Sequence, residues 1–282
     1  MMDRLLLCTD LDRTLLPNGP QPESEQARPL FARLAGQPQV TLVYVTGRDI
    51  GRVEQAIAEW NMPRPDLVLA DVGTTIVSGR GSTWERWADW DAHLAADWVG
   101  LTVTDLQEIL APGPGLVLQH SSRQGRFKLS YDTPPGHEGE VLAETVRKKL
   151  EQAGVKANVI WSLDEPLNKG LLDILPRGAT KFLAIEHVRR ILGFGRGEVL
   201  FAGDSGNDLA VLSSPLPAVL VANARDEVRS RARDDAASRQ LGDQLYCATG
   251  GVLGLNGNYA GGILEGVLHF YPGFGACLED SP

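Results

Sequence analysis

Short apolar runs alternate with amphipathic stretches along the first seventy residues of the chain. The runs at 5–8, 40–45 and 66–70 are almost wholly apolar, which is typical of strands that are buried on both faces. Between these runs, residues 23–34 and 49–59 have the spacing of apolar positions that helices show. The order strand, helix, strand, helix, strand predicts a parallel sheet with crossover helices.

The pattern changes between about residue 79 and residue 169. Apolar and polar side chains alternate over 127–132 and over 155–159, which is typical of an antiparallel sheet with one polar face. Further helices are predicted over 91–98, 103–110 and 138–153, and further strands over 115–119 and 171–175. We therefore expect a separate α+β module here, with helices on one face of its sheet.

The first pattern then resumes towards the C-terminus. It predicts helices over 180–192, from 226 onwards and over 261–270, and strands over 198–201 and 218–221. The predicted fold class is α/β: a Rossmann-like parallel-sheet core with helices on both faces, plus an inserted α+β module with an antiparallel sheet. The core would comprise residues 1–79 and 170–282, and the insertion residues 80–169.

The balance of charge narrows the range of partners. The 282 residues include 27 Lys and Arg against 36 Asp and Glu, a net charge of −9, whereas nucleic acids and anionic membranes attract basic surfaces. Three scattered cysteines, Cys8, Cys247 and Cys277, are too few for a disulfide framework. The apolar run near the N-terminus is too short for a signal peptide or a spanning helix. We expect a cytoplasmic protein that binds neither nucleic acid nor membrane.

Acidic residues follow two of the predicted strands. Asp10 and Asp12 come after the first strand, and Asp204 and Asp208 come after the strand at 198–201. The carboxyl ends of parallel strands share one edge of the sheet, where α/β proteins bind their ligands. Because clustered carboxylates repel one another and burial opposes their ionisation, either some of them stay protonated or a cation lies among them. Oxygen ligands suit Mg²⁺, which usually binds a phosphate as well.

Groups that bind phosphate occur on neighbouring elements. Thr46 and Gly47 follow the second strand, where they supply a hydroxyl and a turn with accessible backbone amides. Lys181 lies at the start of a predicted helix and supplies an ammonium group. Hydroxyl, amide and ammonium groups together stabilise the charge of a phosphate.

Four motifs occur in a fixed order along the chain. They are DLDRT at 10–14, TGR at 46–48, Lys181 and GDSGND at 203–208. In this order they resemble the haloacid dehalogenase superfamily of phosphotransferases, and the insertion resembles the larger, type IIB-like cap of that superfamily, which selects the leaving group. The chain as a whole is similar to sucrose-phosphate phosphatases at four further segments: DVGTTI (71–76), LDILPRGATK (172–181), VANARDEV (221–228) and YAGGILEGVLHF (259–270).

The resemblance implies roles for the acidic residues and for the lysine. Asp10 would be the nucleophile that forms an aspartyl-phosphate, and Asp12 would act as general acid and then as general base. Asp10, the backbone carbonyl of Asp12 and Asp204 would hold Mg²⁺, with Asp208 binding the ion directly or orienting its ligands. Lys181 would neutralise charge on Asp10 and on the transferred group.

The resemblance also implies roles in substrate binding. Thr46 and the amide of Gly47 would hold phosphate oxygens, and Asn207 would orient the substrate or the acidic turn. Two interpretations stay open for Arg48, which would contact the substrate or form a surface salt bridge. The same holds for Lys128, which lies on the polar face of a strand in the insertion and would reach the substrate or remain solvated.

The implied activity is Mg²⁺-dependent hydrolysis of a sugar phosphate, with sucrose 6-phosphate split into sucrose and phosphate. Phe182 after Lys181 and Thr75 after Gly73 and Thr74 depart from the family pattern, so mannosylfructose-phosphate, glucosylglycerol-phosphate and glycosylglycerate-phosphate stay open as substrates. A phosphohexomutase of the same superfamily is one alternative activity. A regulatory module that binds Mg²⁺ and phosphate without turnover is another. A sugar-phosphate synthase stays open as a protein partner.

Overall fold

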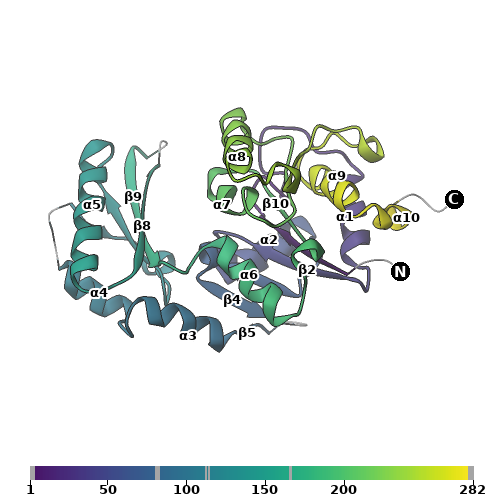
Figure 1. The fold of residues 1–282 in the computed structure, drawn as a ribbon. Helices are drawn as coiled ribbons and strands as arrows, with labels where there is room; N and C mark the ends of the chain where they lie inside the picture. The colour runs from purple at the N-terminus through teal and green to yellow at the C-terminus, as the bar shows by residue number, and fades with distance from the viewer. Residues whose placement is uncertain (1–3, 80–82, 112, 114, 165–166, 279–282) are drawn as a thin grey trace. The chain divides into compact units, whose positions relative to one another are not determined.

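The computed structural model describes residues 4–79, 83–111, 113, 115–164 and 167–278. These residues form two compact units, which Figure 1 draws as a ribbon. Unit 1 comprises Met1–Arg86 and Lys181–Pro282, and unit 2 comprises Trp87–Thr180.

Unit 1 is built on an eight-stranded sheet with strand order β12-β11-β10-β1-β2-β3-β4-β5. The strands from β12 to β3 pair in parallel, while β4 and β5 add two antiparallel strands at one edge. The strand bounds are β1 (Leu5–Thr9), β2 (Val40–Val45), β3 (Leu67–Ala70), β4 (Thr75–Ser78), β5 (Glu85–Arg86), β10 (Val199–Gly203), β11 (Ala218–Leu220) and β12 (Leu245–Cys247). The parallel core predicted from the sequence is confirmed, and β4, β5 and β12 extend it.

Helices cover both faces of this sheet, which is why its central strands are apolar throughout. Leu5 and Leu7 of β1 belong to the core cluster that α1 (Ala27–Ala35) and α9 (Ala260–Phe270) cover. Side chains alternate along a strand, so Leu6 and Cys8 point to the other face, where α6 (Lys181–Ile191) and α7 (Leu209–Leu212) contact the sheet. The other helices of unit 1 are α2 (Ile50–Trp60), α8 (Asp226–Ser238) and α10 (Gly275–Leu278).

Glycines allow α9 to approach the sheet closely. A Cβ atom on Gly266 would lie 2.5 Å from the Cβ of Val219 in β11, far inside ordinary van der Waals contact. On Gly262 it would lie 2.3 Å from the carbonyl oxygen of Gly257. The small residues of the sequence AGGILEG therefore set the distance between this helix and the strand.

Unit 2 has a four-stranded antiparallel sheet with strand order β6-β7-β9-β8. Leu129, Tyr131, Leu172 and Ile174 are buried on one of its faces, and α5 packs on β8 with α4 beside it. The bounds are α3 (Ala88–Asp97), α4 (Val103–Leu110), β6 (Val117–Leu118), β7 (Leu129–Thr133), α5 (His137–Gln152), β8 (Ala157–Asp164) and β9 (Lys169–Pro176). The predicted α+β module with an antiparallel sheet is confirmed.

The bounds of unit 2 differ from the insertion expected over residues 80–169. Strand β9 pairs along its whole length with β8 and along most of it with β7, so the chain stays in the second sheet as far as Pro176 and in unit 2 as far as Thr180. At the other end, β5 pairs with β4 and remains in unit 1. Residues 80–82, where the insertion was expected to begin, lie outside the described residues.

Tryptophans of unit 2 serve mainly in packing. Trp90 and Trp98 are fully buried, and the indole nitrogen of Trp161 donates a hydrogen bond to Thr133 Oγ1 at 3.0 Å. Trp84 belongs to unit 1, where its indole donates to Glu54 and the Arg64 guanidinium lies over its ring.

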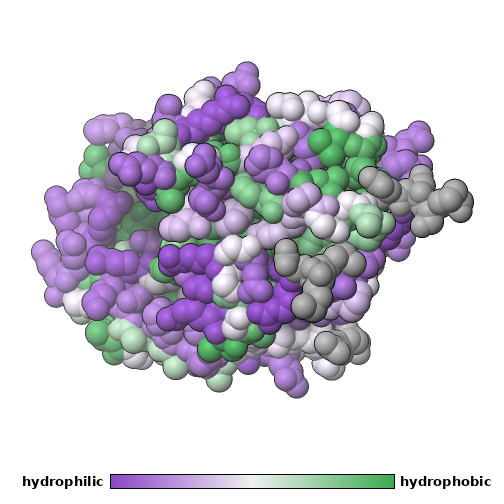
Figure 2. All heavy atoms as spheres, turned by 45° about the vertical axis from the view of Figure 1, so that its right-hand side comes forward, coloured by the Kyte–Doolittle hydropathy of each residue, from purple (hydrophilic) through white to green (hydrophobic). Residues whose placement is uncertain are grey.

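Hydrophilic residues, interrupted by smaller hydrophobic areas, cover the face of the molecule that Figure 2 shows. Within the described part of the chain, no helix combines the length and the apolarity that crossing a membrane requires.

Candidate functional site

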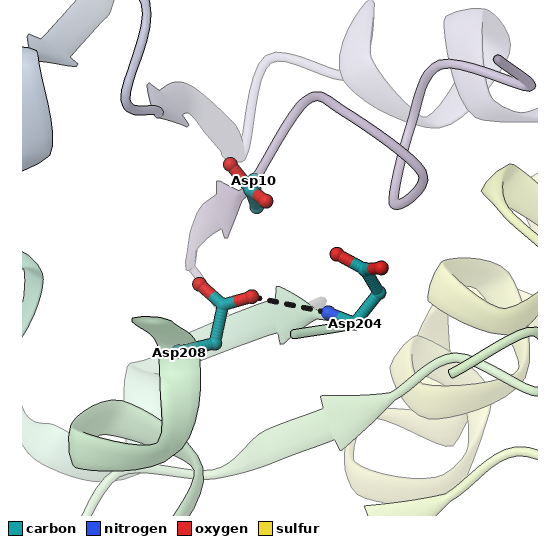
Figure 3. A group of neighbouring side chains, drawn as sticks. All are labelled: Asp10, Asp204 and Asp208. Atoms are coloured by element: carbon teal, nitrogen blue, oxygen red, sulfur yellow. Dashed lines mark hydrogen bonds between the residues drawn. The ribbon is translucent and has the colours of Figure 1, made fainter. Parts of the chain in front are cut away.

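Three carboxylates meet at the carboxyl edge of the parallel sheet in unit 1. Asp10 follows β1, and Asp204 follows β10, the parallel neighbour of β1; Thr9 of β1 lies opposite Ala202 of β10. Oxygen atoms of Asp10, Asp204 and Asp208 all lie within 4.8 Å of one another, and each residue is almost completely buried. Figure 3 shows the three carboxyl groups converging on a common space. The sequence analysis expected four carboxylates here, those of Asp10, Asp12, Asp204 and Asp208, and the structure brings three of them together without the side chain of Asp12.

Asp208 shapes the turn that carries Asp204. Its Oδ2 accepts hydrogen bonds from the backbone N–H groups of Asp204 (3.1 Å, dashed in Figure 3) and Ser205 (3.2 Å). A Cβ atom on Gly203 would lie only 2.7 Å from Cγ of Asp208. A glycine is therefore needed at 203 because the Asp208 side chain folds back over it.

Lys181, the first residue of α6, lies buried between two of the carboxylates. Its Nζ is 3.2 Å from Oδ1 of Asp10 and 2.7 Å from Oδ1 of Asp208, and it donates a hydrogen bond to Oδ1 of Asn207 at 3.0 Å. Burial opposes the charged ammonium, but the two carboxylates outweigh this effect and raise the pKa of Lys181 above its ordinary range. The lysine therefore stays positively charged at neutral pH.

Two of the carboxylates hold their protons more strongly than exposed aspartates do. Burial, opposed by Lys181 and reinforced by Asp208, raises the pKa of Asp10 to about 7. Burial and Asp208 raise the pKa of Asp204 to about 6, against the opposing charge of Arg13. A divalent ion would restore both groups to the ionised state, and a set of carboxylate oxygens suits such an ion. The residues present therefore fit a divalent metal ion.

The Asp12 side chain lies apart from this acidic cluster. Arg48 binds it through two hydrogen bonds, Nε to Oδ2 at 2.8 Å and Nη2 to Oδ1 at 2.5 Å, and Asn18 donates to Oδ1 at 2.7 Å. Partial burial tends to raise the pKa of Asp12, but the hydrogen bonds and the charge of Arg48 lower it below its ordinary value. Asn18 was not among the predicted site residues, although its place in a proline-rich turn is typical of an Asn that bonds to nearby backbone.

The TGR motif forms the loop after β2. Thr46 is buried, and its Oγ1 accepts a hydrogen bond from the backbone N–H of Arg48 at 3.1 Å, while no described residue accepts the hydroxyl proton, which can therefore be donated to a ligand. Gly47 is exposed. The backbone N–H of Val72 donates to the carbonyl oxygen of Thr46 at 3.0 Å, and Val72 has a φ of 61°, which is unusual for a β-branched residue. The strained turn after β3 therefore supports this loop, a role that the sequence analysis did not assign.

Further predicted residues take different positions. Asn207 is exposed and contacts Lys181, as described above. Lys128 belongs to unit 2, where it is half-buried immediately before β7, and its contact with a substrate stays a prediction. Two residues of the first motif, overlooked as site residues, contact Asp204: Thr14 Oγ1 donates to Oδ1 at 3.3 Å, and Arg13 Nε lies 3.4 Å from Oδ2.

The parallel sheet brings three buried carboxylates, a lysine and the loop that carries Thr46 to one edge. This arrangement defines the class of protein. The chain is a phosphatase of the haloacid dehalogenase superfamily. Residues 3–271 match the model of the family sucrose-6F-phosphate phosphohydrolase, and the chain belongs to this family.

Known relatives and structures are similar over most of the chain. A protein of Nitrosococcus oceani, named only as a HAD-like hydrolase, is 45% identical over 99% of this chain and 75% of its own length. Sucrose-phosphatase 1 of Nicotiana tabacum is 30% identical over 80% of this chain, which spans 52% of that protein. The sucrose-phosphatase structure from Synechocystis, solved with sucrose and phosphate, has a TM-score of 0.71 at 26% identity and covers 95% of this chain and 98% of its own.

Proposed function

We propose that this protein is a Mg²⁺-dependent phosphatase that hydrolyses a sugar phosphate, with sucrose 6-phosphate as the first substrate to test. The observation that carries the proposal is the buried pair of Asp10 and Asp204 beside the charged Lys181. A nucleophilic carboxylate, a site for a hard cation and a fixed ammonium group are together what transfer of a phosphoryl group to an aspartate requires.

Asp10 would attack the phosphorus atom of the substrate. A bond forms between phosphorus and a carboxylate oxygen of Asp10, and the bond from phosphorus to the sugar oxygen breaks. Water then attacks the aspartyl-phosphate, releases inorganic phosphate and restores Asp10. Asp10, Asp204 and the backbone carbonyl of Asp12 would hold Mg²⁺, which would shield the repulsion between carboxylate and phosphate. Lys181, 3.2 Å from Asp10, would neutralise further negative charge.

Asp208 would orient the site rather than bind the ion. Its Oδ2 accepts bonds from two backbone amides and its Oδ1 faces Lys181, so both of its oxygens already have partners. Thr46 would donate its free hydroxyl proton to a phosphate oxygen, and the backbone amide of the exposed Gly47 would do the same.

Asp12 would give a proton to the leaving sugar oxygen and later take one from the attacking water. With Arg48 bound to both of its oxygens, Asp12 is a carboxylate, which is the state that accepts a proton. Donation of a proton requires that Arg48 leaves Asp12, and a negatively charged substrate would draw the guanidinium away. This gives Arg48 the role in substrate binding that the sequence left open.

The identity of the sugar rests on the family. Membership of the sucrose-6F-phosphate phosphohydrolase family favours sucrose 6-phosphate, while similarity to a mannosylfructose-phosphate phosphatase and to a glucosylglycerol-phosphate synthase keeps other glycoside phosphates in the test. Unit 2 would select the sugar, with Lys128 as one contact and with Asn207 of unit 1 as another. A cytoplasmic location and a synthase partner stay predictions.

The test is phosphate release from a panel of sucrose 6-phosphate, mannosylfructose-phosphate, glucosylglycerol-phosphate, glycosylglycerate-phosphate and hexose phosphates, with Mg²⁺ or with EDTA. We expect release that depends on Mg²⁺ and that Asp10→Asn abolishes. The matched control, Asp235→Asn, removes an equivalent charge from a partly exposed position on α8 and should keep full activity. If the protein released phosphate from none of these sugar phosphates, the proposal would be refuted. Transfer of the phosphoryl group between hexose positions would indicate a mutase.

A further inference from the structure

Arg13, between Asp12 and Thr14, has an unusual backbone conformation. Its φ is 60°, in the left-handed region where a residue with a side chain is disfavoured relative to glycine. Its side chain is 29% exposed. Glycine would fit this backbone better than arginine does, which directs attention to what the arginine side chain contacts.

Two asparagines hold this backbone conformation from both sides. The N–H of Arg13 donates to Oδ1 of Asn18 at 2.8 Å, and its carbonyl oxygen accepts from Nδ2 of Asn223 at 2.6 Å. The buried Asn223 also accepts a hydrogen bond from the backbone N–H of Tyr259 at 2.9 Å. Segments after β1 and β11 and the start of α9 thus fix the direction in which the Arg13 side chain leaves the chain.

That direction brings the guanidinium to Asp204. Arg13 Nε lies 3.4 Å from Oδ2 of Asp204. This nitrogen is buried, and among the described residues none accepts a hydrogen bond from it. Its interaction with Asp204 is therefore electrostatic, and the Asp204 oxygen keeps its lone pairs available for another ligand.

The charges of the site explain what such an arginine would do. Asp10, Asp204 and Asp208 carry three negative charges when ionised, against the positive charges of Lys181 and Arg13. A positive charge beside Asp204 repels a divalent ion bound to that carboxylate, and the same charge attracts a phosphate that binds next to the ion. These two effects have opposite signs.

We propose that Arg13 is a positioning residue that weakens the binding of the divalent ion at Asp204 and strengthens the binding of phosphate. The proposal rests on the proposed function, because it takes the acidic cluster as the metal site. An ion bound to Oδ2 of Asp204 at about 2 Å would lie within about 6 Å of the Arg13 side chain. At that distance even the dielectric of water gives a repulsion worth about tenfold in affinity, and the buried position of Asp204 makes this a lower bound.

The experiment compares Arg13→Gln, which removes the charge, with Arg13→Lys, which keeps it. The dissociation constant of Mg²⁺ alone, and then that of inorganic phosphate at saturating Mg²⁺, are measured by calorimetry on the full chain. We expect Arg13→Gln to bind Mg²⁺ at least about tenfold more tightly and phosphate several-fold more weakly, and Arg13→Lys to stay near wild type. Arg231→Gln removes a highly exposed charge from α8 and should change neither constant.

The opposite signs separate this role from a structural one. The inference would be overturned if Arg13→Gln left both dissociation constants unchanged or weakened the binding of both Mg²⁺ and phosphate. Arg13→Gly suits the left-handed backbone and provides the same test should Arg13→Gln fail to fold. Wild-type protein that binds no Mg²⁺ would instead overturn the metal site of the proposed function, and with it this inference.

Discussion

Replacement of Gly203 by alanine tests whether the Asp208 side chain organises the site. The backbone at 203 is outside the left-handed region, so alanine introduces no backbone strain. The new Cβ would lie 2.7 Å from Cγ and 2.8 Å from Cβ of Asp208, which is tighter than two carbon atoms tolerate. Asp208 must therefore shift, which weakens the hydrogen bonds that it accepts from the amides of Asp204 and Ser205 and its ion pair with Lys181.

The size of the effect follows from these contacts. Overpacking by one methyl group costs about 1–3 kcal/mol, whereas complete loss of a buried ion pair costs about 3–5 kcal/mol. Because Asp208 needs only a partial shift, we expect the free energy of unfolding to fall by about 2–4 kcal/mol. The affinity for Mg²⁺ should fall at least tenfold, since Asp204 loses the turn that holds it.

Urea unfolding and Mg²⁺ calorimetry on the full chain measure both effects. Gly206→Ala is the matched control, because it lies in the same loop and an added Cβ there would meet no atom within 4 Å. Its stability and its affinity for Mg²⁺ should remain close to those of the wild type. A Gly203→Ala variant with wild-type stability and wild-type affinity would refute the assignment of Asp208 as the residue that organises the turn.

Three further predictions concern stability. Because burial raises the pKa of Asp10 from its ordinary value of 3.8 to about 7, the folded protein binds more protons than the unfolded chain between these pH values. Without metal, the contribution of Asp10 to stability should therefore fall as the pH rises through this window, and the stabilisation by Mg²⁺ should grow. Thermal unfolding with EDTA or with Mg²⁺ measures both effects, and a metal effect that is independent of pH would contradict the prediction. Gly266→Ala should lose about 1–3 kcal/mol against Val219 despite the better helix propensity of alanine, whereas Gly261→Ala, with no atom closer than 3.4 Å, should not. Asn223→Ala leaves a carbonyl and an N–H unpaired and should lose about 2–4 kcal/mol in urea unfolding; a loss below about 1 kcal/mol would show that the Arg13 turn does not depend on Asn223.

Much of the fold could be predicted because most of its strands are short apolar runs that can be recognised from neighbouring residues in the sequence. Residues 5–8 and 40–45 are recognisable from a few neighbours, since both faces of a central parallel strand are buried. The short strands were harder to predict: β12 has three residues and β5 two, too few to show any periodicity. They exist because a neighbouring strand offers unpaired backbone groups, which their own sequence does not reveal.

Some features of the site could likewise be predicted from the sequence, and others could not. The sequence by itself determined that Asp10 and Asp204 end parallel strands, and parallel pairing then requires them to share an edge. Only the tertiary structure decided that Asp12 turns to Arg48 and that Arg13 faces Asp204. The physical reason is that these contacts join segments between 36 and about 190 residues apart. Their geometry depends on side-chain packing and on a left-handed turn that the nearby Asn18 and the distant Asn223 hold, and no local pattern of residues encodes the contact with Asn223.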